Sequence, residues 1–518
     1  MPVEAFIQTT DRDPSHEGIE ERCGLTAYYA LSPQKDTFDR TIRAAFGVQH
    51  RGQKGAGFLV RGDDGKTVCE TGDGLIPEAL TESGLKDRPD GNDKWALVHC
   101  RYGTSGGWES RNLQPIEVDG FEEPVHVAHN GQFVLDESLE SLRESPEESD
   151  SLLFTRFLAN APGKDLEEKI MYALSKVKGA YSLIIGSGDK MYLARDPHGN
   201  RPLVYGRTNE GVLIGSETTI FNHETEEIKD VTYVERGTIM RIDDDGITEL
   251  ADLSSLGEPG DCSFETAYFK RPDSQIIQRA TGELTTVGKL RIELGGQIAK
   301  EGAFKKEDYD FAIGMPDSGS LVAAGFAMES GITFLPLVTR DHYYPASKRA
   351  FMNDEEKEDI KKKVREKIVT LSDKSLWEGK RVVIGDDSIV RGDTSAAVNE
   401  ILRELGVAHI TWIIGYPPVV DTCHLGVSMR TKDELVAVKN NRDPAAIAGA
   451  IGADEVHFIS DHGFMDIATG GNTVTPDDSK DLFMANGFCG GCTGGSYPVT
   501  EQGVIWRAPN VTMDRRSV

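Results

Sequence analysis

Short apolar runs separated by turn residues characterise the chain up to about residue 250. The runs at 181–185 and 191–194 are bounded by glycine and aspartate, which is typical of short β-strands. Helices are expected at 151–158 and 166–177, between such runs. The pattern predicts a β-rich unit that a few helices interrupt.

The second half of the chain alternates differently. Strands are expected at 309–315, 381–385 and 409–414, with an apolar helix at 321–329. Before the last strand, a further helix carries apolar residues on one face at offsets of three, four and seven (Val398, Ile401, Leu402, Leu405), and Gly406 should end it in a left-handed conformation. This order of strand, loop, helix and strand predicts a parallel α/β sheet, which binds ligands at the carboxyl ends of its strands.

A stretch rich in serine, glycine and proline at 253–259 separates the two halves and is expected to be a linker. The domains expected from these patterns are 1–22, 23–255, 256–480 and a glycine-rich tail at 481–518. Residues 353–367 are expected to form a highly charged, solvated helix.

The chain has 518 residues and a net charge of −28. A chain of this length is too long for a single ordinary hydrophobic core, so two or three domains are expected. The acidity argues against nucleic acid as a partner, because a phosphate backbone needs a basic surface. No apolar run approaches the roughly 20 residues of a membrane helix. The polar, acidic start argues against a secretory signal, so a cytoplasmic location is expected.

Four of the seven cysteines, here called the cysteine quartet, are placed as metal ligands often are: Cys262, Cys423, Cys489 and Cys492. From spacing alone, a C-x-x-C with two distant cysteines is compatible with a zinc site, an iron–sulfur site or a redox pair. Cys69 and Cys100 are expected to be small buried hydrophobic residues.

Several motifs in the first half resemble those of class II glutamine amidotransferases. They are Cys23-Gly24, HRGQKGAG at 50–57, HCRYGT at 99–104, NLQP at 112–115, HNG at 129–131 and SDS at 149–151, in the order and near the spacing of that family. The resemblance implies an N-terminal-nucleophile fold, an αββα sandwich.

In such enzymes the cysteine thiolate attacks glutamine and its own free α-amino group is the base. Cys23 can act in this way only if residues 1–22 are removed as a propeptide. The resemblance further implies an oxyanion hole at Asn130 and Gly131 and glutamine contacts from Arg51, Arg101, Thr104 and Asp150. A structural ion pair is the alternative for Arg101 and Asp150.

Residues 382–395 (VVIGDDSIVRGDTS) resemble the phosphoribosyl pyrophosphate loop of type I phosphoribosyltransferases. The loop follows a strand and opens a helix, where backbone amides and the helix dipole favour a phosphate. The resemblance implies binding by Asp317, Asp386, Asp387, Ser388, Arg391, Gly392, Thr394 and Ser395, and a magnesium ion held near Ser318, Asp386 and Asp387.

Two single residues and one segment depart from the family pattern. Asp393 stands where threonine is usual, and is expected either to cap the following helix or, less favoured, to face the 5′-phosphate. Residues 340–345 replace the usual lid, leaving Lys348 and Arg349 as substitute cations. Gly385 replaces a usual valine.

The resemblance to the amidophosphoribosyltransferase family extends from Cys23 to about residue 498, and includes the F-E-x-x-Y-F motif at 264–269. It implies transfer of ammonia, along an internal path, from glutamine to phosphoribosyl pyrophosphate, the first step of purine synthesis. One branch of this family has propeptides and a [4Fe–4S] cluster at the positions of the cysteine quartet. A homotetramer inhibited by purine nucleotides is also implied. Two alternatives remain: a paralogue that aminates another phosphorylated sugar, and a non-enzymatic nucleotide-sensing relative.

Overall fold

A computed structural model of the chain describes residues 23–85, 91–101, 112–135, 137–278, 281–340, 364, 368–370, 373–427, 431–476 and 481–499. The expected charged helix at 353–367 and the lid beyond Arg340 lie outside the described residues, apart from residue 364. In the part of the chain that is described, no helix is both long enough and apolar enough to cross a lipid bilayer.

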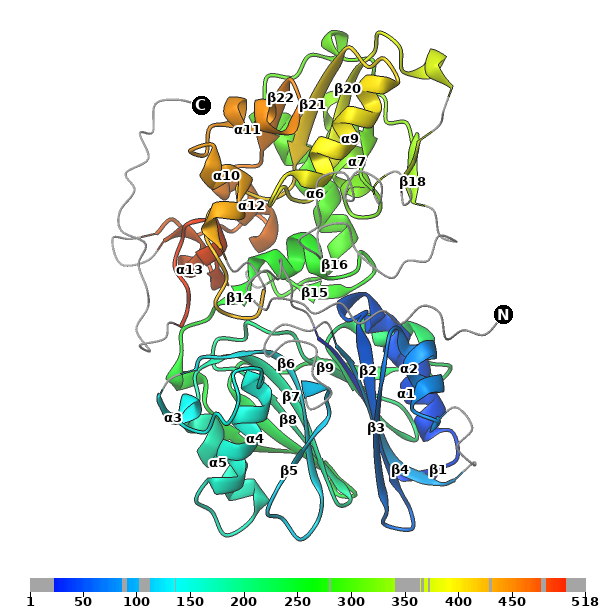
Figure 1. Ribbon diagram of the computed structural model, residues 1–518, viewed down its shortest axis with the longest axis vertical. Coiled ribbons are helices and arrows are strands. Elements are labelled where there is room, and N and C mark those ends of the chain that lie inside the picture. Colours follow the sequence, from blue (N-terminus) through cyan, green and yellow to red (C-terminus); the bar gives the residue numbers. More distant parts are fainter. Residues whose placement is uncertain are drawn as a thin grey trace.

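The first half contains two antiparallel sheets (Figure 1). One has seven strands in the order β11 (Lys229–Tyr233), β9 (Val204–Arg207), β10 (Gly211–Gly215), β1 (Gly24–Gln34), β4 (Asp93–Arg101), β2 (Gly55–Gly62) and β3 (Thr67–Asp73). The other has six, in the order β13 (Gly246–Asp252), β12 (Thr238–Asp243), β8 (Lys190–Arg195), β7 (Gly179–Ser187), β6 (Val125–Phe133) and β5 (Ile116–Val118).

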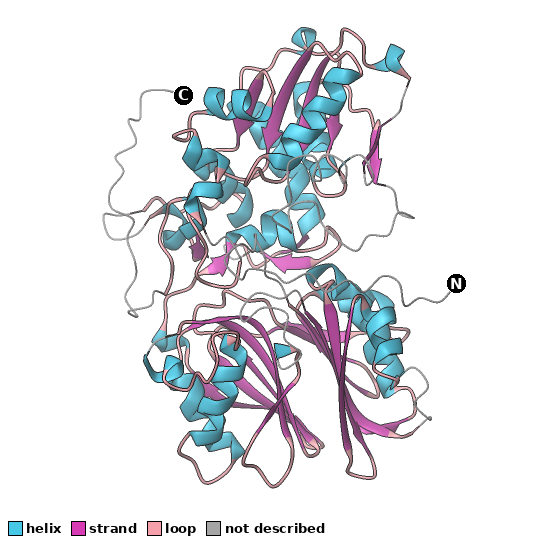
Figure 2. Ribbon diagram, viewed as in Figure 1, coloured by secondary structure: helices cyan, strands magenta, loops and turns pink. Residues whose placement is uncertain are grey.

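The two sheets face each other and helices cover their outer faces (Figure 2). Buried residues of both sheets, among them Trp95, Leu97, Ile184 and Leu193, form the core between them. Helices α1 (Thr37–Ala45) and α2 (Ile76–Glu82) lie on the seven-stranded sheet, and α3 (Glu137–Glu140), α4 (Asp150–Asn160) and α5 (Leu166–Lys176) lie on the six-stranded sheet. The expected αββα sandwich is therefore confirmed, with the helices expected at 151–158 and 166–177 present as α4 and α5.

The second half is built on a four-stranded parallel sheet in the order β17 (Phe311–Gly314), β20 (Arg381–Asp386), β21 (His409–Ile414) and β22 (Glu455–Phe458). Its main helices are α6 (Val287–Glu301), α7 (Gly319–Ser330), α9 (Asp393–Glu404), α11 (Pro444–Ile451) and α12 (Asp461–Thr469). Gly406 has a φ of +91°, which confirms its expected left-handed conformation after α9. The parallel α/β sheet predicted from the alternation is confirmed.

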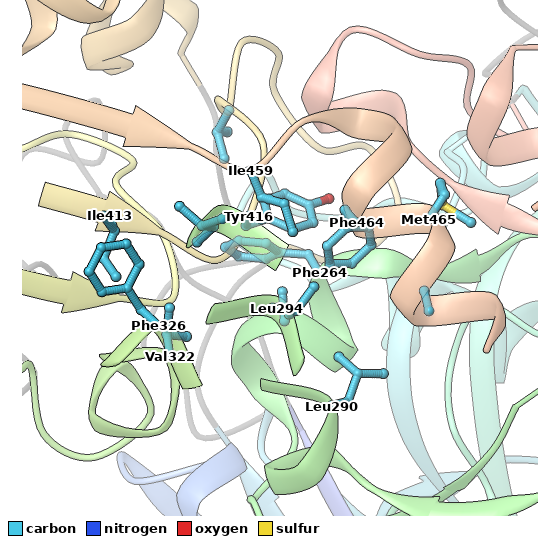
Figure 3. Close-up of a cluster of buried hydrophobic side chains, with 14 of the residues drawn as sticks. Phe264, Leu290, Leu294, Val322, Phe326, Ile413, Tyr416, Ile459, Phe464 and Met465 are labelled. Atoms are coloured by element: carbon cyan, nitrogen blue, oxygen red, sulfur yellow. The ribbon is translucent and has the colours of Figure 1, made fainter. Parts of the chain in front are cut away.

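Alternate residues of the sheet point into two separate cores. Val383 and Ile413 pack with α6, α7 and α12, in the cluster that Figure 3 shows around Phe264 and Tyr416. Val382, Ile384 and Trp412 pack with α9 and α11 on the opposite face. A strand that is buried on both faces has a continuous run of apolar residues in its sequence. For this reason β20 and β21 could be recognised from the sequence.

Shorter elements connect the two halves and complete the second. The strands are β14 (Asp261–Cys262), β15 (Gln275–Ile277), β16 (Leu284–Thr286), β18 (Val338–Arg340), β19 (Ile368–Thr370) and β23 (Phe488–Cys489). The short helices are η2 (Phe46–Arg51), η5 (Thr218–His223), η6 (Ser254–Leu256), η7 (Glu265–Phe269), η8 (Lys306–Asp308), η9 (Lys374–Leu376), η10 (Lys432–Glu434), α10 (Val436–Lys439), α13 (Leu482–Ala485) and η11 (Gly491–Thr493). β14 and β15 lie where the two halves meet (Figure 1).

Candidate active sites

Cys23 immediately precedes β1, at the edge where β1 pairs with β4. Its carbonyl oxygen accepts a hydrogen bond from Arg51 Nε at 3.2 Å. All three guanidinium nitrogens of Arg51 donate to protein acceptors, the other two to Glu217 and Glu265. Arg51 is fully buried, and its Nε contacts the backbone of Cys23.

One hydroxyl connects the strand of Cys23 to the predicted oxyanion hole. Ser216 Oγ, just after β10, accepts from the Leu25 N–H at 3.0 Å and lies 3.5 Å from Asn130 Nδ2. Asn130 is on β6, in the opposite sheet. The two sheets thus bring the start of β1 and the HNG motif together, as a nucleophile and an oxyanion donor require.

Gly131 follows Asn130 with a φ of +141°, a conformation that side chains rarely adopt. A Cβ at this position would collide with the carbonyl oxygen of Ala180 on the neighbouring strand β7. Gln114 fixes the adjacent His129, whose backbone N–H donates to Gln114 Oε1 at 2.6 Å. The motif is therefore held rigidly, with glycine required by both space and backbone angle.

Asp150 is the first residue of α4 and is buried. The Phe133 N–H donates to its Oδ2 at 2.8 Å. Burial raises the pKa of this carboxyl to about 6, although the Phe133 amide and the charge of Arg101 act in the opposite direction. Arg101 is the last residue of β4 and is also buried. Thr104 lies outside the described residues.

The phosphoribosyl motifs meet at the carboxyl edge of the parallel sheet. β20 ends at Asp386, and the loop after the neighbouring strand β17 carries Asp317 and Ser318. Ser318 Oγ donates to Asp387 Oδ2, and Ser388 Oγ donates to Asp387 Oδ1 at 2.8 Å. Two loops far apart in sequence therefore form one polar site, as the topology of such sheets predicts.

The adjacent carboxyls suit a divalent cation. Asp387 is buried, and burial together with the charge of Asp387 raises the pKa of Asp386 well above its usual value. A cation would stabilise both carboxylates. Among the described residues no group of three or more His, Cys, Asp or Glu side chains is placed to hold a metal ion. Magnesium needs no such group here, because it is usually bound by one or two carboxylates together with substrate phosphates.

Asp393 does not occupy the capping position expected for it. Gly392, with a φ of +87°, is the N-cap of α9, so Asp393 is the first residue of the helix itself. The left-handed glycine advances the helix start by one residue, and the capping expectation is wrong. Thr394 and the buried Ser395 follow in the first turn of α9.

Two predicted phosphoribosyl contacts are engaged in ion pairs. Arg391 Nη2 lies 2.5 Å from Glu434 Oε2, and Asp317 Oδ2 lies 3.0 Å from Arg340 Nη1. Arg340 ends β18, at the start of the altered lid. The Asp317–Arg340 pair is about half exposed on both sides, and such a pair exchanges readily with solvent or ligand.

Gly385 is required by helix packing, which explains its presence where valine is usual. A Cβ here would lie 2.7 Å from both the Cβ and the backbone nitrogen of Ala323. Helix α7 therefore packs directly against the backbone of β20 at this point.

The cysteine quartet converges beside the junction of the two halves. Cys262 on β14 pairs with Cys489 on β23 in parallel register, and Cys492 follows in η11. Cys423 Sγ accepts from the Leu425 N–H at 3.4 Å. Burial and, to a smaller extent, the charges of Cys262, Cys492 and Cys423 act in the same direction on the pKa of Cys489 and raise it.

Burial raises the pKa of Cys262 to about 11 and raises that of Cys489 well above its usual value. The thiolate forms that metals bind would therefore need a cationic group among them. Polar groups also point at the sulfurs, since Tyr416 Oη lies 3.4 Å from Cys492 Sγ. This donor set fits an iron–sulfur cluster, whose sulfurs commonly accept hydrogen bonds. As expected, Cys100 is buried, whereas Cys69 is only partly buried.

Several residues of these sites were not identified from the sequence. Ser216, Glu217 and Arg201 belong to no motif quoted above, and only their position near the ends of buried strands could have drawn attention to them. Glu265 lies inside the F-E-x-x-Y-F motif but had no role assigned. Their contacts are with residues far away in the sequence, such as Glu265 with Arg201, 64 positions apart, and with Arg51, 214 positions apart, which sequence patterns do not reveal.

Comparison with known proteins gives consistent matches. A family profile described as a glutamine amidotransferase domain matches residues 108–223. Amidophosphoribosyltransferase 2 of Arabidopsis thaliana, a chloroplast protein, is 32% identical over 506 residues, covering 95% of this chain and 82% of its own. The Bacillus subtilis amidophosphoribosyltransferase is 31% identical, covering 93% and 95% respectively.

A solved structure of the Bacillus subtilis glutamine phosphoribosylpyrophosphate amidotransferase, complexed with ADP and GMP, superposes with a TM-score of 0.76 at 30% identity. The match covers 92% of this chain and 97% of that one. These similarities favour the phosphoribosyl acceptor over the two alternatives left open by the sequence. The chain belongs to the amidophosphoribosyltransferase family, enzymes that transfer ammonia from glutamine to phosphoribosyl pyrophosphate in the first step of purine biosynthesis.

Proposed function

We propose that Cys23 is the nucleophile of glutamine hydrolysis and that its own α-amino group, freed by removal of residues 1–22, is the base. The observation that carries this proposal is the position of Ser216, which bonds to Leu25 and approaches Asn130. A single side chain thereby fixes the distance between the nucleophile's strand and the oxyanion donor. An α-amine titrates near pH 8, which suits a base acting on a thiol.

In this proposal the glutamine substrate is held by opposite charges at its α-carbon. Arg101 binds the α-carboxylate and Asp150 binds the α-ammonium, both from buried positions where such pairs are strong. Asn130 and the Gly131 amide stabilise the negative charge that develops on the carbonyl oxygen. Thr104 is a further glutamine contact in the proposal, carried over from the family motif.

In the acceptor half, phosphoribosyl pyrophosphate binds at the carboxyl edge of the parallel sheet. Asp386 and Asp387 orient the ribose hydroxyls, and the first turn of α9 offers backbone amides to the 5′-phosphate. Ser318, Asp386 and Asp387 would hold magnesium, which neutralises charge on the pyrophosphate leaving group. Asp317 and Arg391 contact phosphoribosyl pyrophosphate in this proposal. To do so they exchange their ion-pair partners, Arg340 and Glu434, for the ligand.

The cysteine quartet is proposed to hold a [4Fe–4S] cluster that cross-links three segments of the chain. Cys262, Cys423, Cys489 and Cys492 would hold the cluster, since four cysteine thiolates are the usual ligand set of a [4Fe–4S] cluster. The grouping for a single ion is not found among the described residues. Neither half-reaction needs electrons, so the cluster is structural or oxygen-sensing in this proposal.

Inhibition by purine nucleotides and assembly as a homotetramer are further proposals, supported by the family and by the nucleotide complex of the Bacillus subtilis relative. A cytoplasmic location is also proposed, as expected from the sequence.

The direct test is an assay of pyrophosphate release. Purified protein is incubated with glutamine, phosphoribosyl pyrophosphate and magnesium, and the pyrophosphate formed is measured. Mass analysis of the active protein should give an N-terminus at Cys23. Activity in a protein that retains residues 1–22 would contradict the role of the α-amine. Pyrophosphate release with no dependence on glutamine or ammonia would contradict the amidotransfer.

A further inference from the structure

Four charged side chains form a buried network between the two halves of the chain: Arg51, Glu217, Glu265 and Arg201. Their side chains are at most 3% exposed. Arg51, Glu217 and Arg201 belong to the glutamine half, whereas Glu265 belongs to η7, which follows β14. Buried charges of this kind persist only when paired, and each carboxylate here has at least two cationic or polar partners.

Glu265 holds Arg51 with both carboxylate oxygens. Arg51 Nη2 donates to Oε1 at 2.5 Å and Nη1 donates to Oε2 at 3.0 Å, a two-pronged geometry that fixes the plane of the guanidinium. With the plane fixed, the remaining nitrogen, Nε, points at the carbonyl oxygen of Cys23. The orientation of the residue that carries the thiol therefore depends on a carboxylate from the other half of the protein.

The same carboxylate is anchored a second time within the network. Arg201 Nη1 donates to Glu265 Oε1 at 3.1 Å, and its Nη2 donates to the Leu425 carbonyl at 2.6 Å. Leu425 lies two residues after Cys423 in the acceptor half. Burial alone would raise the pKa of Glu265, but Arg51 and Arg201 hold it below its usual value, so the carboxylate stays charged. Glu265 is thus bonded to Arg51 and Arg201 of the glutamine half, and Arg201 is bonded in turn to Leu425 of the acceptor half.

We propose that Glu265 is a positioning residue for glutamine hydrolysis, acting through Arg51 on the backbone of Cys23. The inference rests on the proposed nucleophilic role of Cys23. It predicts that a residue of the acceptor half governs the rate of the glutamine reaction while leaving the acceptor reaction unaffected. A misplacement of about 1 Å in a reacting group can cost on the order of 10²-fold in rate.

The test replaces Glu265 by Gln, which keeps the shape of the side chain but removes its charge and one acceptor oxygen. In the mature protein, which begins at Cys23, the kcat of glutamine-dependent phosphoribosylamine formation should fall by about tenfold or more. The ammonia-dependent activity and the KM for phosphoribosyl pyrophosphate should remain as in the native protein. A matched control is Glu224→Gln, because Glu224 is equally buried and bonds to Arg40 at 3.1 Å. That control should show no selective loss of glutamine use.

A second variant, Arg201→Lys, keeps the charge but cannot bond to Glu265 and Leu425 in the same forked geometry. Arg201→Lys should show the same selective loss of glutamine-dependent activity. If a thermal melt shows that Glu265→Gln does not fold, Arg201→Lys takes its place as the test of the proposal. Equal loss of both activities in a folded variant, or unchanged glutamine kcat, would overturn the proposal. Cys23→Ala measured in parallel separates the two claims: if it still uses glutamine, the nucleophile assignment fails, whatever the Glu265 variant shows.

Discussion

Cys262 lies directly opposite Cys489 in the parallel strand pair of β14 and β23. The pairing brings a segment near the chain's end against the segment that begins the acceptor half. Ser263 strengthens this contact, since its hydroxyl donates to the Cys489 carbonyl at 2.7 Å. Two members of the cysteine quartet are therefore positioned by backbone hydrogen bonds, independently of any metal.

Anaerobically purified protein is expected to contain about four irons per chain and to show a brown, oxygen-sensitive absorbance. Cys489→Ser should bleach this absorbance and lower the melting temperature, because metal binding and folding are coupled. Cys69→Ser is the control, since Cys69 lies outside the quartet and should keep the iron. Stoichiometric zinc with no iron in the native protein would contradict the cluster proposal.

Glutamine affinity should depend on the protonation of Asp150. Its pKa is raised from 3.8 to about 6, so below that pH the carboxyl is neutral and cannot pair with an ammonium group. The KM for glutamine should therefore rise as pH falls, by up to about tenfold per pH unit. Asp150→Asn should have a high KM with no such dependence.

Acid unfolding can be separated from this effect by the sign of the linkage. A carboxyl whose pKa is raised on folding binds its proton more tightly in the native state, so this group's contribution to stability increases as pH falls from about 6 to about 4. The loss of glutamine affinity should consequently precede any drop in melting temperature. A pH-independent KM above pH 5 in the native enzyme would contradict the role of Asp150.

Gly385→Ala should destabilise the acceptor half. The added Cβ would approach the backbone nitrogen of Ala323 to 2.7 Å, and such overpacking costs about 1–3 kcal/mol. Gly449→Ala is the matched control, because that position in α11 has open space around it. It should stabilise the protein by about 0.5–1 kcal/mol, the usual gain in a helix interior. Denaturant unfolding of both variants gives the comparison, and equal stability of the two would show that α7 can move away from β20.

Asp393→Thr should tighten the binding of phosphoribosyl pyrophosphate. Asp393 is the first residue of α9, in the turn whose backbone amides are proposed to bind the 5′-phosphate, so its negative charge is expected to oppose that binding. Two like charges at about 4 Å repel by roughly 1 kcal/mol in water and more in a drier site, so a gain of about tenfold, or 1.4 kcal/mol, is expected.

Titration calorimetry of the native protein, Asp393→Thr and Asp393→Glu with magnesium measures this difference. Asp393→Glu keeps the charge and should bind as weakly as the native protein. The threonine variant should lose up to about 1 kcal/mol of stability, because it gives up a favourable charge at the helix start. Equal affinity of all three proteins would show that the carboxylate points away from the ligand.

The sequence predicted the elements whose patterns are local. The apolar run of β21 was placed with its observed bounds, and Gly406 was recognised because helix ends with left-handed glycine have a simple signature. The motifs around Asn130 and Asp386 were recognised because glutamine and phosphoribosyl chemistry restrict the residue types that can serve. Asp386 lies at the end of β20, where the fold places its ligand sites, whereas Asn130 lies within β6.

What the sequence did not predict depends on contacts between distant residues. Asp393 resembled a helix cap, but the left-handed Gly392 takes that position, and a single left-handed residue is enough to shift a helix start. The sequence did not reveal that Arg51 is held by Glu265, 214 positions away, whose carboxylate accepts from its guanidinium. Only the folded chain brings these two residues together.

The central claim, that Cys23 produces the ammonia used at a separate acceptor site, is tested most directly by Cys23→Ala. Glutamine-dependent formation of phosphoribosylamine and ammonia-dependent formation should be measured on the same mature protein. The account predicts complete loss of the first activity and retention of the second, since the thiol acts only on glutamine. Loss of both activities to the same extent in a folded variant, or continued use of glutamine, would contradict it.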